Sequence, residues 1–211
     1  MQKYSVFSLI KNAFSDHQNW EVAWKDPTPK SEYDVVIIGG GGHGLATAYY
    51  LAKEHKITNV AVIEKGWIGG GNVGRNTTII RSNFMYDANA RFNEFGMDLW
   101  RNLSQELNFN VMFSPRGIIN LAHSDAQMNA YARRGNSMRL NGIDAKLLNR
   151  DEVKKLIPMA DFSDEVRFPI FGGLMQPSAG TARHDGVAWG YARQADSCLL
   201  YTSDAADDSL R

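Results

Sequence analysis

The sequence predicts an α/β fold, in which a Rossmann-like domain is followed by the start of a second domain with a mixed sheet. Three consecutive features near residue 40 predict the first of these domains: the apolar run Val35–Ile38, a cluster of glycines, and a helix rich in small residues. Four branched apolar residues without a polar interruption suit a strand that is buried on both faces. A strand, a tight turn and a helix in this order begin a βαβ unit.

The glycines have the spacing Gly39-x-Gly41-x-x-Gly44, which is typical of a dinucleotide-binding turn. Gly39 permits the tight turn, Gly41 lets backbone N–H groups approach a pyrophosphate, and Gly44 lets the helix pack closely against the strand. The positive end of the helix 45–53 then faces the phosphates. A tight turn without a ligand is the alternative interpretation.

A second apolar strand, 59–63, ends in Glu64. This places an acidic side chain about 20 residues after the glycines, where it can accept hydrogen bonds from an adenosine ribose. We therefore expect Glu64 to belong to the same binding site.

Composition and charge exclude several classes of function. The chain has 211 residues, 44% of them hydrophobic, and its 23 basic residues balance its 23 acidic ones. No net charge attracts nucleic acid or anionic lipid, so neither partner is expected. No apolar run is long enough to span a membrane, and the first residues lack the features of a signal peptide. We expect a cytoplasmic protein, and no metal site is predicted.

The only cysteine, Cys198, opens a segment of unusual origin. The string CLLYTSDAAD matches, codon by codon, the translation of a transposon adapter that is used in sequencing libraries. We expect residues 198–211 to be non-native read-through and the natural chain to continue beyond Ser197. A genuine polar tail is the alternative. Without Cys198, disulfides and thiol catalysis are excluded.

Residues 1–31 form an N-terminal arm, predicted to be a short helix followed by an extended linker. Its Trp20 and Trp24 need a partner surface, either the missing half of the chain or another subunit. After Glu64, a second glycine-rich stretch runs from residue 68 to 78 and leads into Ile79, Ile80 and Arg81. So many glycines indicate close approach of backbone to a ligand, and a surface linker is the alternative.

Helical spacing of apolar residues predicts a long helix from Asp87 to Leu107, with Phe92 and Phe95 in the core. The segment 111–121, which contains Gly117, is predicted to be a strand pair or one bulged strand.

A helix follows from Ser124 to Leu140, with its arginines, Arg133, Arg134 and Arg139, on the solvent face. Asn149 is expected to cap a short helix that ends at Pro158. The segment 168–176 then returns to a strand, and a small-residue helix begins near Asp185.

With these features in place, the chain resembles the amine-oxidising, D-amino-acid-oxidase-like flavoproteins, and among them the β subunits of heterotetrameric sarcosine oxidases. The resemblance extends from Met1 to about Ser197, and RNTTIIRSN and TARHDGVAWGYAR are its most specific stretches. It implies a noncovalent FAD and a second flavin, FMN, attached covalently to His184. Taken alone, His184 would be an ordinary structural histidine.

The resemblance also implies the domain boundaries. Residues 32–110 would be the first part of the FAD-binding domain and 111–176 the start of a truncated substrate domain. Residues 177–197 would return to the FAD domain with the FMN-attachment segment. The implied cofactor-binding residues are Gly39, Gly41, Gly42, His43, Glu64, Lys65, Asn72, Arg75, Asn76 and Thr77 for FAD, and Arg81 and His184 for FMN.

The implied activity is the oxidation of sarcosine to glycine, with the one-carbon unit passed to tetrahydrofolate or released as formaldehyde. Electrons would pass from FAD to FMN and then to O2, giving H2O2, and other sarcosine oxidase subunits would be partners. No catalytic residue is assigned, because the flavin carries the redox step. Another FAD-dependent amine or amino-acid dehydrogenase and a noncatalytic dinucleotide-binding subunit are the alternatives.

Overall fold

The computed structural model describes residues 6–16, 18, 28–198 and 201–203. Trp20 and Trp24 lie outside these residues. The chain divides into two compact units: unit 1 comprises residues 1–75 and 187–211, and unit 2 comprises residues 76–186. The boundary between them falls inside the helix α6 (His184–Ser197).

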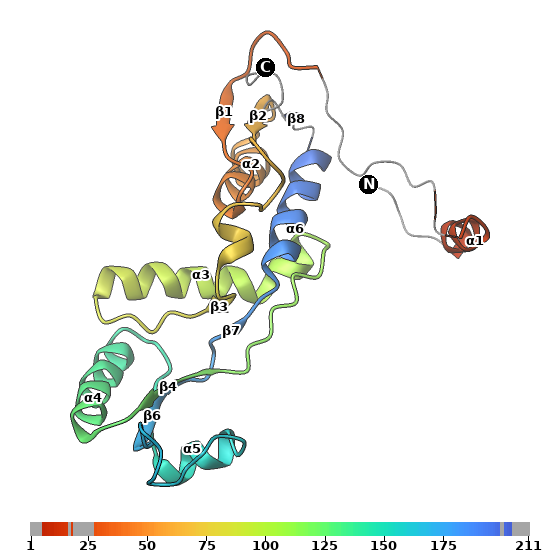
Figure 1. The fold of residues 1–211 in the computed structure, drawn as a ribbon. Helices are drawn as coiled ribbons and strands as arrows, with labels where there is room; N and C mark the ends of the chain where they lie inside the picture. Colours follow the sequence, from red (N-terminus) through yellow and green to blue (C-terminus); the bar gives the residue numbers. More distant parts are fainter. Residues whose placement is uncertain (1–5, 17, 19–27, 199–200, 204–211) are drawn as a thin grey trace. The chain divides into compact units, whose positions relative to one another are not determined.

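The sheet of unit 1 is parallel. β1 (Val35–Ile38) pairs with β2 (Val60–Ile63), and β2 pairs on its other side with β8 (Tyr201–Ser203). α2 (Gly42–His55) connects β1 to β2 and lies alongside them (Figure 1). The predicted order of strand, glycine turn, helix and strand is therefore confirmed. β8 lies in the segment that we expect to be non-native.

The burial of β1 differs from the prediction. Val36 is 52% exposed and Ile38 is 88% exposed, whereas Val60 is fully buried. The expectation that β1 is buried on both faces is wrong for this chain. Side chains alternate across a strand, and only the face that carries Val35 and Ile37 is covered.

The core of unit 1 joins α2, β2 and α6. Ala48 of α2 and Ala188 of α6 are fully buried, and the rings of Tyr49 and Tyr191 have centroids 5.7 Å apart. Short side chains let helices pack closely. The small-residue helix that the sequence predicts near Asp185 is thus α6.

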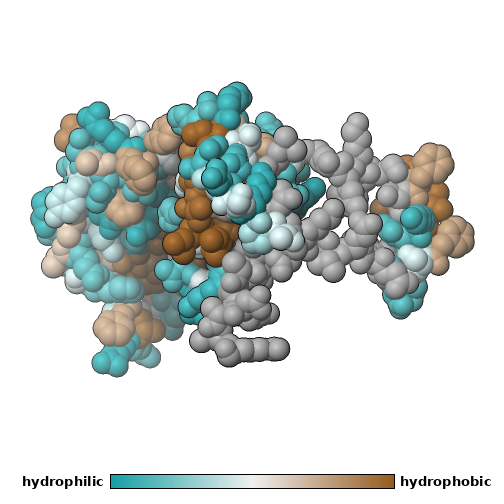
Figure 2. All heavy atoms as spheres, turned by 90° about the horizontal axis from the view of Figure 1, so that it is seen from above, coloured by the Kyte–Doolittle hydropathy of each residue, from teal (hydrophilic) through white to brown (hydrophobic). Residues whose placement is uncertain are grey.

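α1 (Val6–Phe14) is the helix predicted in the N-terminal arm. Phe7 is 83% exposed and Phe14 is 90% exposed. The brown and tan spheres at the right edge of Figure 2 belong to this helix. Its apolar side chains therefore face solvent in this chain.

Unit 2 contains two antiparallel sheets. β3 (Ile79–Ile80) pairs with β7 (Gly180–Thr181). In the larger sheet, β6 (Gly172–Gln176) lies between β4 (Ile118–Ala122) and β5 (Lys146–Asn149).

Two helices pack on this sheet, α4 (Asp125–Leu140) and α5 (Arg150–Leu156) (Figure 1). Met138 of α4 and Leu174 of β6 share one buried cluster, and Val153 of α5 and Leu148 of β5 share another.

Both helices begin as the sequence predicts. The Ser124 side chain accepts a hydrogen bond from the backbone N–H of Gln127 at 3.2 Å. Asn149 and Glu152 cap α5 reciprocally, with N–O distances of 2.8 and 2.9 Å. Local side-chain chemistry therefore sets these helix starts.

The segment 111–121 forms only the strand β4 at its end, so both predicted alternatives, a strand pair and one bulged strand, are wrong. Ser114 makes an isolated bridge with Thr181, and Gly117 has a φ of +84°. A positive φ ends the extended conformation, which is why residues before Gly117 do not continue β4.

α3 (Asp87–Glu106) confirms the predicted long helix, but not the role of its aromatic residues. Phe92 is 77% exposed and Phe95 is 64% exposed. The helix buries Ala90 in its first half and Met97 and Leu103 in its second. Helical spacing identifies residues that share a face, and the neighbouring elements decide which part of that face is covered.

Candidate functional site

The glycine turn has the geometry that its spacing predicts. Gly39 has a φ of +107°, and a Cβ on Gly44 would lie 2.0 Å from the carbonyl oxygen of Gly39. Real Cβ atoms do not come so close to backbone, so only glycine fits at residue 44. The predicted roles of Gly39 in the turn and of Gly44 in helix packing are confirmed.

The first turn of α2 is open. Its N-cap, Gly41, has no side chain to bond the terminal N–H groups. A Cβ on Gly41 or on Gly42 would meet only the side chain of Val73, at 3.7 and 3.5 Å. His43 is exposed. The positive end of the helix dipole is thus presented by bare backbone, which suits an anionic group.

Glu64 lies at the end of β2 beside this turn. Its Oε2 accepts a hydrogen bond from the Gly40 N–H at 2.7 Å, and its Oε1 accepts one from the Gly66 N–H at 3.0 Å. A Cβ on Gly40 would lie 3.1 Å from the Glu64 Cβ. Each carboxylate oxygen has two lone pairs, so Glu64 can still accept hydrogen bonds from a ligand.

Gly40 is a residue of this turn for which the sequence predicts no role. The unbroken run of four glycines, Gly39 to Gly42, was the available signal, because the dinucleotide pattern requires glycine at only two of these positions.

The second glycine-rich stretch packs against the first. The Gly69 N–H donates to the Gly40 carbonyl oxygen at 3.0 Å, and the Gly74 N–H donates to the Gly69 oxygen at 2.9 Å. Gly69 has a φ of +73°. These bonds describe an ordered loop, not a free linker. Its predicted ligand-contacting residues in unit 1, Lys65, Asn72 and Arg75, are all exposed.

The remaining predicted residues belong to unit 2. Asn76 and Thr77 are exposed, and the Asn76 Oδ1 accepts a hydrogen bond from the Thr78 N–H at 2.6 Å. The Thr78 carbonyl oxygen in turn accepts a hydrogen bond from the Ala182 N–H at 3.1 Å. This bond extends the pairing of β3 with β7 by one residue on each strand. His184 lies two residues further along the chain than Ala182.

His184 is the first residue of α6, and its buried Nδ1 has no hydrogen-bond partner among the residues that the structure describes. Buried polar atoms are nearly always paired, so this nitrogen is unusual for a structural histidine. The neighbouring Arg183 Nε donates to both carboxylate oxygens of Asp185, at 2.8 and 3.0 Å. This bond lowers the pKa of Asp185.

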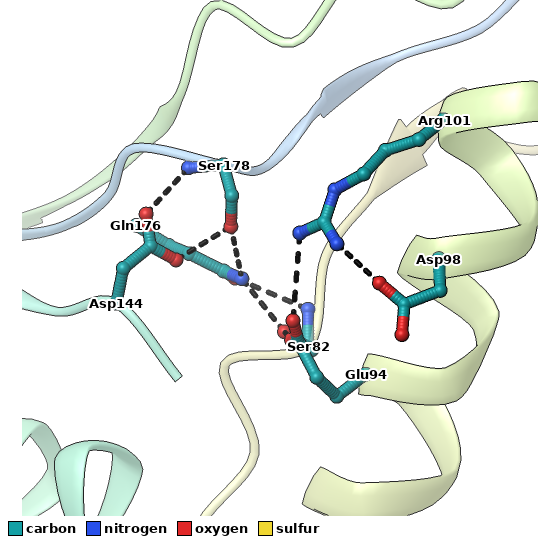
Figure 3. A network of polar contacts seen from close by, with 7 residues as sticks. All are labelled: Ser82, Glu94, Asp98, Arg101, Asp144, Gln176 and Ser178. Carbon is teal, nitrogen blue, oxygen red and sulfur yellow. Dashed lines mark hydrogen bonds and ion pairs between the residues drawn. The ribbon is translucent and has the colours of Figure 1, made fainter. Parts of the chain in front are cut away.

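A chain of polar contacts links the residues that follow β3 to the residues that precede β7 (Figure 3). At its centre the fully buried Gln176 accepts from the Ser82 N–H at 3.1 Å and donates to the Ser82 Oγ at 2.7 Å. Ser82 also donates to Glu94 of α3 at 2.6 Å, and the Ser178 N–H donates to Asp144 at 2.8 Å. Arg81 and the segment that leads to His184 therefore adjoin one buried network.

Arg81 lines a cavity of about 310 Å³ between β3 and α3. It is the only charged residue in the lining, which includes Ile79, Phe92, Phe95 and Trp100. Its guanidinium also lies 4.9 Å from the centre of the Phe84 ring.

Arg134 is a residue whose position the sequence did not predict. We expected it on the solvent face of α4, but its Nε donates to the Asn83 carbonyl oxygen at 3.0 Å. The Arg134 side chain is therefore half-buried against Asn83, whereas the Arg133 side chain is exposed as expected. No signal in the sequence separates these two adjacent arginines.

Among the described residues, no group of three or more His, Cys, Asp or Glu side chains could hold a metal ion. In the same part of the chain, no helix combines the length and hydropathy that crossing a membrane requires.

Residues 34–197 match a family model described as FAD dependent oxidoreductase. The sarcosine oxidase subunit beta of Rhizobium meliloti is 62% identical over 92% of this chain and 47% of its own length. The subunit of the same name from Rhodobacter capsulatus is 52% identical over 92% of this chain and 46% of its own. The chain thus spans about half the length of the curated relatives it matches.

Solved structures agree with the predicted fold class. L-proline dehydrogenase from P. horikoshii superimposes with a TM-score of 0.74 at 28% identity, over 84% of this chain and 45% of that one. The L-amino acid deaminase of Proteus myxofaciens gives a TM-score of 0.75 over 89% of this chain and 41% of that one. At 19% identity, this second likeness concerns the fold alone.

Proposed function

Because the chain belongs to the FAD dependent oxidoreductase family, we propose that it is the FAD-binding part of a flavoprotein subunit that oxidises sarcosine. It is a homologue of the sarcosine oxidase β subunits, one of which is 62% identical to it. The activity, substrate and partners of the whole protein belong to the proposal, since the chain covers about half of these relatives.

The open first turn of α2 beside Glu64 is the observation that carries this proposal. These residues fit a dinucleotide, because uncapped N–H groups suit a pyrophosphate and a carboxylate with free lone pairs suits a ribose. We assign noncovalent FAD to these elements and their neighbours: Gly39, Gly41, Gly42, His43, Glu64, Lys65, Asn72, Arg75, Asn76 and Thr77.

We assign a covalent FMN to His184, with Arg81 as a further contact. The unpartnered Nδ1 supports this assignment, since a histidine with a purely structural role would have its buried nitrogen paired. The preceding strand β7 is tied to β3 by backbone pairing, so His184 follows a fixed segment.

The proposed reaction converts sarcosine, O2 and water into glycine, formaldehyde and H2O2, or passes the one-carbon unit to tetrahydrofolate. The bound flavins would supply the redox chemistry, with electrons passing from FAD to FMN and on to O2. The chain's own residues bind and orient. N–H groups of the loop 71–77 and the guanidinium of Arg75 would favour negative charge on a reduced ring nearby.

Mass spectrometry of the denatured natural full-length protein, coexpressed with its partner subunits, tests the two-flavin assignment. We expect an adduct with the mass of FMN that is absent from the His184→Ala variant. Bleaching of the visible flavin absorbance when sarcosine is added tests the substrate. Active enzyme with an unmodified His184 contradicts the covalent FMN, and flavin that does not bleach supports a noncatalytic dinucleotide-binding subunit.

Another FAD-dependent amine or amino-acid dehydrogenase is the second candidate, and the likeness to L-proline dehydrogenase at 28% identity favours it. Such an enzyme keeps the glycine turn and Glu64 but does not need a flavin on His184. Flavin that acid extracts completely from active protein supports this candidate.

We also propose that residues 198–211 are non-native and that the hetero-oligomer is cytoplasmic. The end of the family match at Ser197 supports the first point. Sequencing of genomic DNA across codon 197 tests it, because an uninterrupted gene must continue there with a different sequence.

A further inference from the structure

The helix α1 of the N-terminal arm has one apolar side, and that side faces solvent (Figure 2). Its large apolar residues are between 48% and 90% exposed: Val6, Phe7, Leu9, Ile10 and Phe14. At 3.6 residues per turn these positions share one side of the helix, and Asn12 lies on the other.

The spacing of Phe7, Ile10 and Phe14 is that of a helix which binds in a groove. Residues i, i+3 and i+7 lie along one face, and helices that bind in an apolar groove insert side chains with this spacing. α1 has nine residues, and an isolated helix of this length is marginal in water because it is too short to offset the cost of its first turn. Burial of these side chains in a groove would therefore stabilise the helix itself.

The charge of α1 favours a protein groove over a lipid surface. Lys11 is the only charged residue in the helix. Helices that lie on membranes are rich in lysine and arginine on their polar face, which attracts them to anionic lipids. A single lysine provides little of that attraction.

The comparisons indicate which kind of protein carries α1. The family model begins at residue 34, so the fold of the FAD dependent oxidoreductases begins after this helix. The match to the Rhizobium meliloti subunit covers 195 residues, or 92% of the chain. With residues 198–211 excluded as non-native, a match of that length has to include α1. The helix is thus shared with a protein that is named as a subunit, and it lies outside the family fold.

These findings narrow the choice of what covers α1. The absent half of the natural chain, just over half of the curated relative, completes the fold of a family that does not require this helix. A second copy of α1 is too small a partner, because two helices about 14 Å long bury much less than the roughly 1,600 Å² of a standard interface. α1 is therefore suited to an arm that adds to a larger contact with a different subunit.

We propose that α1 docks in an apolar groove on another subunit of the hetero-oligomer, with Phe7, Ile10 and Phe14 as its anchors. The inference rests on the proposed function, which supplies the partner subunits. About 20 residues separate α1 from β1 and span at most about 70 Å when fully extended, so the helix can reach a neighbouring subunit.

The natural full-length protein, coexpressed with its partner subunits, tests the inference. The double variant Phe7→Ala, Phe14→Ala removes two anchors and keeps the helix, because alanine is the best helix former. We expect the dissociation constant of the purified assembly, measured by sedimentation of a dilution series, to rise about a hundredfold, since each buried aromatic anchor contributes about tenfold.

Two controls accompany this variant. Phe7→Leu, Phe14→Leu keeps apolar side chains at the same positions, so its assembly should weaken much less. Asn12→Ala lies on the opposite side of the helix and should leave the dissociation constant unchanged. The full-length chain expressed without its partners should melt at the same temperature with and without the two alanines, because the groove lies on another subunit.

The inference is wrong if the double alanine variant assembles as tightly as the wild type, if Asn12→Ala weakens assembly equally, or if the wild type forms no assembly. A lower melting temperature of the variant chain alone assigns α1 to the second half of its own chain. Loss of self-association assigns a second copy, and loss of binding to phosphatidylglycerol vesicles assigns a membrane. Each of these results also overturns the inference. Bleaching of the wild-type flavin by sarcosine, measured on the same samples, shows separately whether the proposed function holds.

Discussion

A Cβ on Gly44 would lie 2.0 Å from the carbonyl oxygen of Gly39, across the turn that joins β1 to α2. Gly39 turns the backbone through a positive φ, and Gly44 lets the helix α2 pack back against the strand β1. The two positions are thus coupled by steric exclusion.

Gly44→Ala should abolish the close packing of α2 on β1, because backbone atoms cannot move aside as a flexible side chain can. We expect a loss of stability of about 3 kcal/mol or more, as for other steric conflicts with backbone, and a loss of FAD binding. Chemical denaturation checks the first effect.

Gly96→Ala is the matched control, since a Cβ at residue 96 meets nothing within 4 Å. Alanine is preferred to glycine inside a helix by about 1 kcal/mol, so this variant should be more stable than the wild type. Equal destabilisation by both substitutions contradicts the steric argument.

Glu64→Ala should weaken FAD binding by about 1.5–3 kcal/mol, the range for hydrogen bonds to a charged acceptor. Fluorescence titration with FAD measures this change. Glu54→Ala is the control, because Glu54 is exposed on α2 and forms an ion pair with the neighbouring Lys53. An unchanged FAD affinity in Glu64→Ala means that Glu64 serves only the Gly40 and Gly66 N–H groups.

Gln176→Leu should destabilise unit 2 by about 1–3 kcal/mol, because it leaves the buried Ser82 N–H without its acceptor. Urea denaturation measures the loss. Gln105→Leu, at an exposed position of α3, should change the midpoint little. If the two variants unfold alike, the network in Figure 3 does not contribute to stability.

The ion pair of Arg183 with Asp185 predicts a dependence of stability on pH. The hydrogen bond from Arg183 lowers the pKa of Asp185 in the folded state. A lowered carboxyl pKa contributes stability above the unfolded value of about 3.9 and loses it as the pH falls through the folded value.

Asp185→Asn should therefore melt at a slightly lower temperature than the wild type at pH 7, and the difference should vanish on acidification below about pH 3.9. The effect is small, since the pair is exposed. A difference that persists at low pH shows that the charge is not its cause.

Features set by neighbouring residues in the chain could be predicted from the sequence. Ser124 and Asn149 cap their helices because a cap needs only a few consecutive residues. The conformation of the glycine turn follows equally from local sterics. For the candidate site, the sequence identified Gly39 and Gly44 by their spacing.

Features set by distant elements could not be predicted. Arg134 binds Asn83, which lies 51 residues earlier, and nothing near Arg134 distinguishes it from Arg133. Phe92 and Phe95 have the spacing of core residues, and their exposure depends on what packs against α3. The role of Gly40 likewise required the position of Glu64 to be known.

The uncovered face of β1 limits the solubility of this chain more than its stability. Val36 and Ile38 are already exposed in the folded state, so folding correctly does not remove them from water. Two copies could bury these side chains against each other, and this gain grows with concentration whereas the folding equilibrium of one copy does not. The chain should therefore self-associate above a threshold concentration while fully folded. Light scattering of a Val36→Thr, Ile38→Thr double variant should show this threshold at a higher concentration than in the wild type.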